Sequence, residues 1–217
     1  MDGGHFITFE GGEGSGKSTV AALIAERLSD QGLAVLLTRE PEGTDLGRHL
    51  WTYFRELAAA GRRMTAEAEL FLFAADRAEH VRTVIAPALD AGRVVLCDRF
   101  ADSTTAYQGY GRGLDLATVE TVNKAATGGL TPDLTLLLDV PVAEGLRRAR
   151  ALEADAAKLP DAMGAESLAF HERVREGFLA IARANPGRVT VLDAGQPLDS
   201  VERGAIEAVE RLLAERK

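Results

Sequence analysis

The chain has 217 residues, 46% of them hydrophobic and 27% charged, which is enough for one well-buried core and short for two. A net charge of −8 argues against a nucleic-acid polymer as a partner, since nucleic-acid binders usually carry a basic face. The single cysteine, Cys97, excludes a disulfide within the chain, and no stretch approaches the roughly 18 apolar residues that a membrane span needs. We therefore expect one soluble, cytoplasmic domain over residues 1–217, with Cys97 in its core.

Short apolar runs alternate with longer amphipathic segments along the whole chain. The short runs predict strands at residues 6–10, 34–38, 94–98, 134–140 and 189–193. The amphipathic segments predict helices at residues 18–30, 45–60, 65–91, 115–127, 142–157, 165–184 and 198–217. Pro87 predicts a kink or break within the third of these helices. Alternating strands and helices indicate an α/β fold, a doubly wound five-stranded parallel sheet flanked by helices.

A glycine-rich stretch follows the first strand and opens the first helix. Residues 11–18 read Gly-Gly-Glu-Gly-Ser-Gly-Lys-Ser, a full match to G-x-x-x-x-G-K-[ST]. Glycines let backbone N–H groups approach phosphate oxygens, and the helix N-terminus adds unpaired donors. Lys17 adds charge for the β- and γ-phosphates, and the Ser18 hydroxyl is a ligand for Mg²⁺. The expected ATP-binding residues are Gly11, Gly12, Glu13, Gly14, Ser15, Gly16, Lys17, Ser18 and Thr19.

The rest of the chain indicates which class of nucleotide-dependent protein the loop belongs to. A guanine-reading Asn-Lys-x-Asp would indicate a GTPase, but the nearest string, residues 123–126, lacks the Asp and lies in a helical segment. A small-molecule kinase needs a second anion site, for which Arg39, Arg77 and Arg99 are candidates. Arg39 and Arg99 follow the second and third strands, where open α/β sheets bind ligands. The alternative for each arginine alone is a solvated surface charge.

Six stretches carry a resemblance that runs nearly end to end. They are FITFEGGEGSGKST (6–19), TREP (38–41), LFLFAADRAEH (70–80), VVLCDRFADSTTAYQGYGRG (94–113), GLTPDLTLLLDV (129–140) and ESLAFHERVREGFLAIA (166–182). On these residues the chain resembles the bacterial-type thymidylate (dTMP) kinases, a family of P-loop nucleoside monophosphate kinases. The resemblance implies the P-loop kinase fold with a short lid at about residues 151–165, and a homodimer.

The resemblance also implies the reaction and its small-molecule partners. ATP, held with Mg²⁺ on the loop, would transfer its γ-phosphoryl group to dTMP and give dTDP for dTTP synthesis. Catalysis would depend on positioning and charge neutralisation, without a covalent enzyme intermediate. The four histidines therefore receive no catalytic role.

Five residues would recognise the thymidine part of dTMP, according to the resemblance. Phe73 would stack on the thymine ring. Arg77, one turn later on the same helix face, would hydrogen-bond a base carbonyl. Thr104 and Gln108 would read the base edge. Tyr107 would pack under the deoxyribose and leave no room for a 2′-hydroxyl.

Other residues would handle the phosphates, the sugar 3′-hydroxyl and the metal. Glu13 would accept a hydrogen bond from the 3′-hydroxyl, and Arg39 and Arg99 would hold the acceptor phosphate with their planar forks. Asp98 would orient Mg²⁺ through water. The substrate-binding set that the resemblance implies is Glu13, Arg39, Phe73, Arg77, Arg99, Ser103, Thr104, Tyr107 and Gln108. The catalytic set is Lys17, Arg39, Asp98 and Arg99, with Ser18 and Asp98 for the metal.

The chain departs from the family's pattern at three places. Glu42 stands where a glycine is usual, and a carboxylate there would repel the acceptor phosphate unless it points away. Trp51 stands where an arginine that touches the phosphates is expected. In the lid, Ala162 and Gly164 replace the arginine and glutamate of an Asp-Arg-x-Glu motif. A transition-state arginine is worth several orders of magnitude in rate, so the lid change is the most serious of the three.

Two hypotheses follow from these departures. In the first, the protein is a working but slow dTMP kinase in which Arg147, Arg148, Arg150 or Lys158 supplies the cation for the lid. The alternative for these four residues is a solvated basic helix face. In the second hypothesis, the protein is a diverged homologue that binds nucleotides with another acceptor or without significant kinase activity. Binding of dTMP separates the two, and the rate of an Ala162→Arg variant tests the argument about the lid.

Overall fold

A five-stranded parallel sheet forms the centre of the computed structural model, which describes residues 4–156 and 166–215. Its strands are β1 (His5–Glu10), β2 (Val35–Arg39), β3 (Val94–Asp98), β4 (Leu134–Asp139) and β5 (Val189–Asp193). Their order in space is β2-β3-β1-β4-β5, so β1 lies in the middle, paired with β3 and β4. The expected doubly wound parallel sheet is confirmed, and the strand bounds differ from the expected ones by at most one residue.

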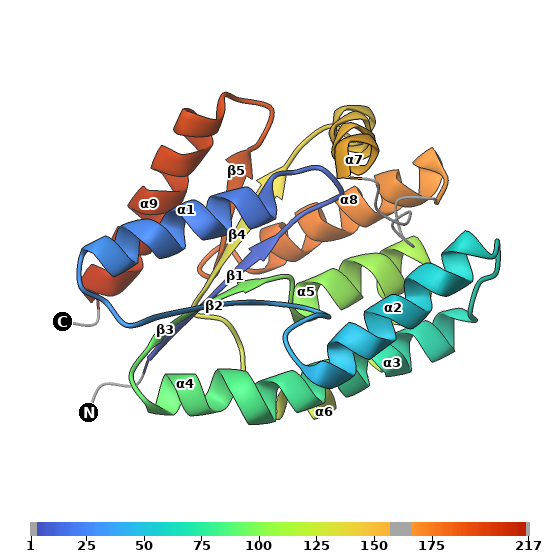
Figure 1. The fold of residues 1–217 in the computed structure, drawn as a ribbon, viewed down its shortest axis with the longest axis horizontal. Coiled ribbons are helices and arrows are strands. Elements are labelled where there is room, and N and C mark those ends of the chain that lie inside the picture. The colour runs from blue at the N-terminus through green and yellow to red at the C-terminus, as the bar shows by residue number, and fades with distance from the viewer. Residues whose placement is uncertain (1–3, 157–165, 216–217) are drawn as a thin grey trace.

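Helices cover both faces of this sheet (Figure 1). The α-helices are α1 (Lys17–Asp30), α2 (Asp45–Ala59), α3 (Ala66–His80), α4 (Ala86–Asp90), α5 (Ala101–Thr104), α6 (Leu116–Thr127), α7 (Val142–Ala156), α8 (Leu168–Ala184) and α9 (Leu198–Glu215). Two segments are π-helical, η1 (Val81–Ile85) and η2 (Thr105–Gly111). Helices α1 and α9 pack on one face, whereas η1, α4, η2 and α8 pack on the other. No helix in the described ranges is both long and apolar enough to span a membrane.

The central strands are apolar along their whole length because both of their faces are covered. In β3, Val94 and Leu96 belong to the cluster with α1 and α9, whereas Val95 and Cys97 belong to the cluster with η1 and α4. This alternation follows from the two-residue period of a strand. The thiol of Cys97 is fully buried, which confirms its expected place in the core.

Side-chain caps determine where several helices begin. Thr44, Thr65 and Ser167 each accept a hydrogen bond from the backbone N–H three residues later, at the starts of α2, α3 and α8. Asp115 caps α6 in the same way, so it precedes the helix to which the sequence pattern assigns it. Capping residues thus explain why α3, α6 and α8 start slightly later than the amphipathic pattern predicts.

The segment expected as one helix over residues 65–91 consists of three consecutive segments, α3, η1 and α4. The change from α to π hydrogen bonding occupies Val81–Ile85, and Pro87 lies in the first turn of α4. Proline fits there because its missing N–H would have no intrahelical partner. The interruption that Pro87 predicts is therefore present, but it comes before the proline instead of at it.

Two helical segments that follow β3, α5 and η2, are not predicted by the amphipathic pattern. Most of their residues are buried, so no polar face marks them as a helix. η2 also packs closely on α8: a Cβ at Gly111 would lie 2.7 Å from the ring of Phe170. Tertiary packing therefore stabilises a helical path that local propensity does not indicate.

Candidate active site

The glycine-rich loop joins β1 to α1 at the middle of the sheet. Gly11, Gly14 and Gly16 have φ angles of 143°, 64° and 89°, a region that side chains with a Cβ rarely adopt. Gly16 is the N-cap of α1 and offers no side-chain acceptor to the first N–H groups of the helix. These donors and the positive end of the helix dipole make the loop suited to phosphate oxygens.

The loop lies directly against the first turn of α7. A Cβ at Gly14 would come within 1.9 Å of the carbonyl oxygen of Gly145, and a Cβ at Gly145 within 2.4 Å of the carbonyl oxygen of Glu13. Only glycine fits at both positions. The contact fixes the loop between α1 and α7, which favours a preorganised phosphate site.

The side chain of Lys17 folds back onto the glycine-rich loop. Its Nζ donates to the carbonyl oxygens of Gly11 at 3.0 Å and Gly12 at 2.7 Å, and to Ser15 Oγ at 3.2 Å. Burial and then the neighbouring charge of Arg99 lower the pKa of Lys17 to about 8. The ammonium group is therefore held at the loop by its own backbone, where an incoming phosphate would restore its full charge.

A pocket of about 280 Å³ opens beside the loop and gathers the residues singled out in the sequence. It is lined by residues 13–19 of the loop and by Arg39, Phe73, Arg77, Asp98, Arg99, Ser103, Thr104, Tyr107 and Gln108. Gly11 and Gly12 line a second, smaller cavity next to it. The structure thus brings the expected nucleotide-binding and substrate-binding residues to one place, although they come from widely separated parts of the chain.

Arg99 is the central cation of the pocket. Its backbone has a φ of 72°, which makes it the non-glycine residue with positive φ in the described ranges. Its Nη2 donates to Glu13 Oε1 at 2.9 Å, its Nη1 reaches Tyr107 Oη at 3.3 Å, and its guanidinium lies 5.1 Å from the centre of the Tyr107 ring. Burial opposes ionisation of Glu13, but the charges of Arg99 and Lys17 outweigh it and lower the pKa of Glu13 to about 2.

A buried carboxyl at the end of β1 holds the turn that carries Arg99. Glu10 accepts hydrogen bonds from the backbone N–H groups of Phe100 at 2.8 Å and Ser103 at 3.3 Å, and from Ser103 Oγ at 2.6 Å. Burial, with the Asp102 carboxylate adding to it, raises the pKa of Glu10 from 4.5 to about 8. We infer that Glu10 stabilises the left-handed backbone of Arg99 by fixing the residues that follow it.

Arg39 lies at the more open end of the pocket. Its Nη2 is 3.7 Å from Asp98 Oδ2 and its Nη1 is 3.6 Å from Glu42 Oε2. Glu42 therefore does not point away from the anion site but pairs with one of its arginines. Half of the Arg39 side chain is exposed, so solvent weakens this pair.

Asp98 and Ser18 form a site whose chemistry suits Mg²⁺. Ser18 Oγ donates to Asp98 Oδ2. The other carboxylate oxygen, Oδ1, is buried and has no hydrogen-bond partner within the described ranges. An unsatisfied buried oxygen next to a hydroxyl is the donor set that a hard cation or its bound water prefers. No larger cluster of metal-binding side chains occurs in this part of the chain, so phosphate oxygens would have to complete the coordination.

Helices α3 and α5 form one side of the pocket. Phe73 is stacked on Phe54 of α2, with ring centres 4.8 Å apart and an angle of 7° between the planes. One face of Phe73 is thus covered, and the residue lines the pocket. A second ring stacked on its other face would extend this arrangement.

The side-chain donors of Arg77 are engaged within the protein. All five of its N–H donors bond to protein acceptors: Nε to Glu40, Nη1 to Thr104 and Asn123, and Nη2 to the carbonyl oxygen of Phe100 and to Glu40. A direct hydrogen bond to a base carbonyl would need one of these bonds to break. As it lies in the structure, Arg77 fixes the hydroxyl of Thr104 at 2.9 Å instead of presenting a free donor.

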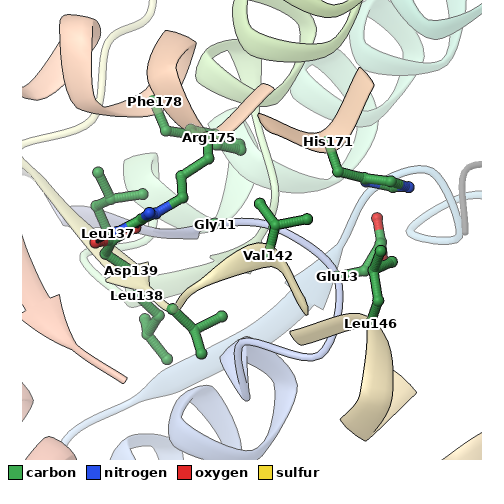
Figure 2. A pocket seen from close by; sticks show the side chains of 12 residues that line it. Gly11, Glu13, Leu137, Leu138, Asp139, Val142, Leu146, His171, Arg175 and Phe178 are labelled. Carbon is green, nitrogen blue, oxygen red and sulfur yellow. Dashed lines mark hydrogen bonds and ion pairs between the residues drawn. The ribbon is translucent and has the colours of Figure 1, made fainter. Parts of the chain in front are cut away.

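The smaller cavity, about 20 Å³, lies behind the loop between the end of β4, the start of α7, and α8 (Figure 2). Its polar side is a bidentate pair in which Arg175 donates to both oxygens of Asp139, at 2.7 and 2.8 Å. Figure 2 also shows His171 of α8 pointing toward the Glu13 carboxylate, whose pKa its charge helps to lower. The cavity holds at most one water-sized molecule, so we assign no ligand to it.

Comparison with known proteins identifies the family. The family model described as thymidylate kinase matches residues 9–204. The chain belongs to the thymidylate kinase family. Thymidylate kinases from Desulfovibrio desulfuricans and Synechococcus sp. (strain JA-3-3Ab) are each 53% identical to it, over 208 and 210 residues that cover 94% and 96% of this chain and 95% and 97% of the relatives. A crystal structure of thymidylate kinase from Ehrlichia chaffeensis is 36% identical with a TM-score of 0.75, covering 96% of this chain and 99% of that one.

The departures from the thymidylate kinase pattern fall partly within the described residues. Trp51 lines the large pocket and brings an indole where a cation is expected. Of the proposed compensating cations, Arg147 and Arg148 both pair with Glu144 on the same helix. Arg150 is exposed and has no ion-pair partner among residues 4–156 and 166–215. The lid departures Ala162 and Gly164, and Lys158, lie outside the described residues.

Three carboxylates in and around the pocket have roles that the sequence pattern does not indicate. They are Glu10, Glu40 and Glu69, all buried. Glu40 follows Arg39 in the TREP stretch, and Glu10 directly precedes the loop, so proximity to a motif is the signal that could have found them. Their partners, however, lie 37 to 93 residues away in sequence, and only the fold reveals them.

Proposed function

We propose that this protein is a dTMP kinase that transfers the γ-phosphoryl group of ATP to dTMP and yields dTDP. The observation that carries the proposal is the pocket of about 280 Å³, which joins a phosphate-binding loop to aromatic, hydroxyl and amide side chains suited to a pyrimidine nucleoside. The relatives that are 53% identical over nearly their full length are named thymidylate kinases, which supports the same acceptor here.

On the donor side, the loop amides, the N-terminus of α1 and Lys17 would hold the triphosphate of ATP. Mg²⁺ would be held by Ser18 and, through water, by Asp98, and when bound it neutralises phosphate charge. The unpartnered Oδ1 of Asp98 supports this role. These groups position the γ-phosphorus and need no covalent intermediate.

On the acceptor side, Arg39 and Arg99 would direct the dTMP phosphate toward the loop. Glu13 and Tyr107, joined by a hydrogen bond of 2.7 Å, would bind the sugar: the carboxylate at its 3′-hydroxyl and the ring beneath it. A ring in this position sterically excludes a 2′-hydroxyl. Ser103, which bonds to Glu10, would complete the acceptor site through its contact with Arg99.

The base would lie against the open face of Phe73, with Thr104 and Gln108 at its edge. We infer that Arg77 contributes indirectly: it donates to the oxygen of Thr104, so the hydroxyl proton of Thr104 is left to donate to a base carbonyl. Arg77 would then act through Thr104 instead of bonding directly to the base, because all five of its N–H donors already bond to protein acceptors.

We also infer a homodimer. Leu46, Tyr53, Phe71 and Leu116 are 42% to 57% exposed and lie on α2, α3 and α6. Helix α3 packs on both α2 and α6, and exposed large apolar side chains on neighbouring helices favour a contact with a second copy. Sedimentation velocity of the wild type and of Phe71→Asp tests this: the variant should sediment as a monomer, and a monomeric wild type would refute the dimer.

Calorimetry with ATP, dTMP and other nucleoside monophosphates tests the proposed function at the level of binding. We expect dTMP to bind in the micromolar range and more tightly than dCMP or dGMP. No binding of dTMP at millimolar concentration would refute the proposal. The comparisons give no support to the alternative, a diverged homologue with another acceptor or without significant kinase activity.

A further inference from the structure

The amide of Gln108 is held by a carboxylate from another helix. Gln108 Nε2, on η2, donates to Oε1 of Glu69, on α3, at 2.7 Å, and both side chains are buried. Glu69 is itself fixed by Arg112, whose Nε lies 3.1 Å from Oε1 and whose Nη2 lies 3.0 Å from Oε2. Such a bidentate fork holds a carboxylate in one orientation.

This arrangement determines which end of the Gln108 amide faces the pocket. A carboxylate paired with a guanidinium accepts hydrogen bonds and has none to donate, so Gln108 must present its NH₂ group to Glu69. The carbonyl oxygen Oε1 then remains for the pocket that Gln108 lines. Within the described ranges no group donates a hydrogen bond to this oxygen. It is also not one of the solvent-inaccessible atoms that lack a partner, so it remains accessible to solvent.

We propose that Glu69 is a specificity-determining positioning residue, which holds Gln108 so that the pocket presents a hydrogen-bond acceptor to the edge of the base. Thymine has an N3–H donor, whereas N3 of cytosine is an acceptor. The oriented carbonyl of Gln108 therefore bonds to thymine and opposes cytosine. This inference rests on the proposed function, in which Gln108 reads the base.

The placement of Glu69 on α3 supports a role in recognition. Glu69, Phe73 and Arg77 are spaced four residues apart and therefore lie on one face of the helix. Arg77 fixes the hydroxyl of Thr104 in the same way that Glu69 fixes Gln108. One face of α3 thus supplies an aromatic wall and two groups that orient the polar side chains at the base edge.

The test measures kcat and KM for dTMP and for dCMP with ATP in a coupled assay of ADP release. The substitution Glu69→Gln keeps the side-chain size but introduces an amide that can donate or accept, so Gln108 can turn. We expect the ratio of kcat/KM for dTMP over dCMP to fall about tenfold, mainly through KM. In the matched control, Glu166→Gln, Arg112 loses its other carboxylate, 2.7 Å away, while Glu69 keeps its bond to Gln108. That variant should keep the ratio within about twofold of the wild type.

A double-mutant cycle with Gln108→Leu shows whether Glu69 acts through Gln108. If it does, Glu69→Gln changes the acceptor ratio no further in the Gln108→Leu background. An unchanged ratio in Glu69→Gln, or full additivity in the cycle, would overturn the proposal. If Glu69→Gln lacks a cooperative thermal transition, Glu69→Asp, which withdraws the carboxylate by one methylene, takes its place with the same expected direction. A wild type without preference for dTMP would instead refute the proposed function itself.

Discussion

The buried carboxyl of Glu10 leads to a specific prediction about stability and pH. Its pKa is about 8 in the folded protein, mainly because of burial, compared with 4.5 for an ordinary glutamate. Below pH 4.5 the group is protonated in both the folded and the unfolded chain. Between pH 4.5 and about 8 the unfolded chain has lost the proton that the folded protein still holds. The free energy of unfolding should therefore decrease as pH rises through this interval.

The size of the effect follows from the same interval. At about 1.4 kcal/mol per pKa unit, a rise from 4.5 to about 8 sets an upper bound of about 5 kcal/mol. Local relaxation and water entry reduce this, so we expect about 2 to 3 kcal/mol. Glu10→Gln mimics the protonated acid and keeps an acceptor for the N–H groups of Phe100 and Ser103. It should equal the wild type in stability at pH 4.5 and exceed it by this amount at pH 9.

Urea unfolding monitored by circular dichroism from pH 4.5 to 9 measures the difference. Glu26→Gln, at an exposed position of α1, is the matched control and should show no pH-dependent difference from the wild type. A wild type that gains stability relative to Glu10→Gln as pH rises, or a difference that does not change with pH, would refute the account of Glu10. Glu10→Ala should be about 3 kcal/mol less stable than Glu10→Gln at every pH, because neither variant titrates at this position and alanine leaves buried donors without an acceptor.

Three further predictions concern catalysis. Glu42→Gln should lower the KM for dTMP about twofold to fourfold at low salt, because it frees Arg39, and the gain should vanish in 0.5 M salt; a raised KM would show that Glu42 helps binding. Asp98→Asn should raise the Mg²⁺ concentration for half-maximal rate about tenfold or more, and an unchanged Mg²⁺ titration would exclude Asp98 from the metal site. Ala162→Arg should raise kcat at least about tenfold with little change in KM for dTMP, whereas an unchanged kcat would refute the argument that an arginine at this position acts on the donor phosphates.

The sequence predicted the sheet because the central strands carry their evidence locally. Val94 to Cys97 are apolar on both faces of their strand. The glycine-rich loop lies between a strand and a helix, where its backbone N–H groups and those of the helix N-terminus point to one place. Helix α5 and η2 escaped prediction because their stability comes from contacts with α8 and α3, not from an amphipathic pattern. Helix propensity and hydrophobic periodicity identify a helix that is buried on one side. They do not identify a helical segment that is buried on all sides.

The same distinction separates the site residues that the sequence could indicate from those it could not. Arg39 and Arg99 follow strands, so a general rule about sheet edges locates them. Glu69 matters only because η2 places Gln108 beside it, 39 residues further along the chain. The sequence also could not show how Arg77 is held, because its partners, Glu40 and Asn123, come from two other segments. The hydrogen-bond partners of buried charged groups depend on tertiary structure. A sequence motif can therefore indicate a charged residue, but it does not indicate the residue to which that group bonds.

The most direct test of the account is the initial rate of ADP release from ATP and Mg²⁺ with dTMP, dCMP, dGMP, dAMP or UMP as acceptor. The pocket geometry predicts that dTMP gives the highest kcat/KM, at least about tenfold above dCMP, and that UMP is excluded by the ring of Tyr107. A faster reaction with another monophosphate, or ADP release that no acceptor stimulates, would contradict it.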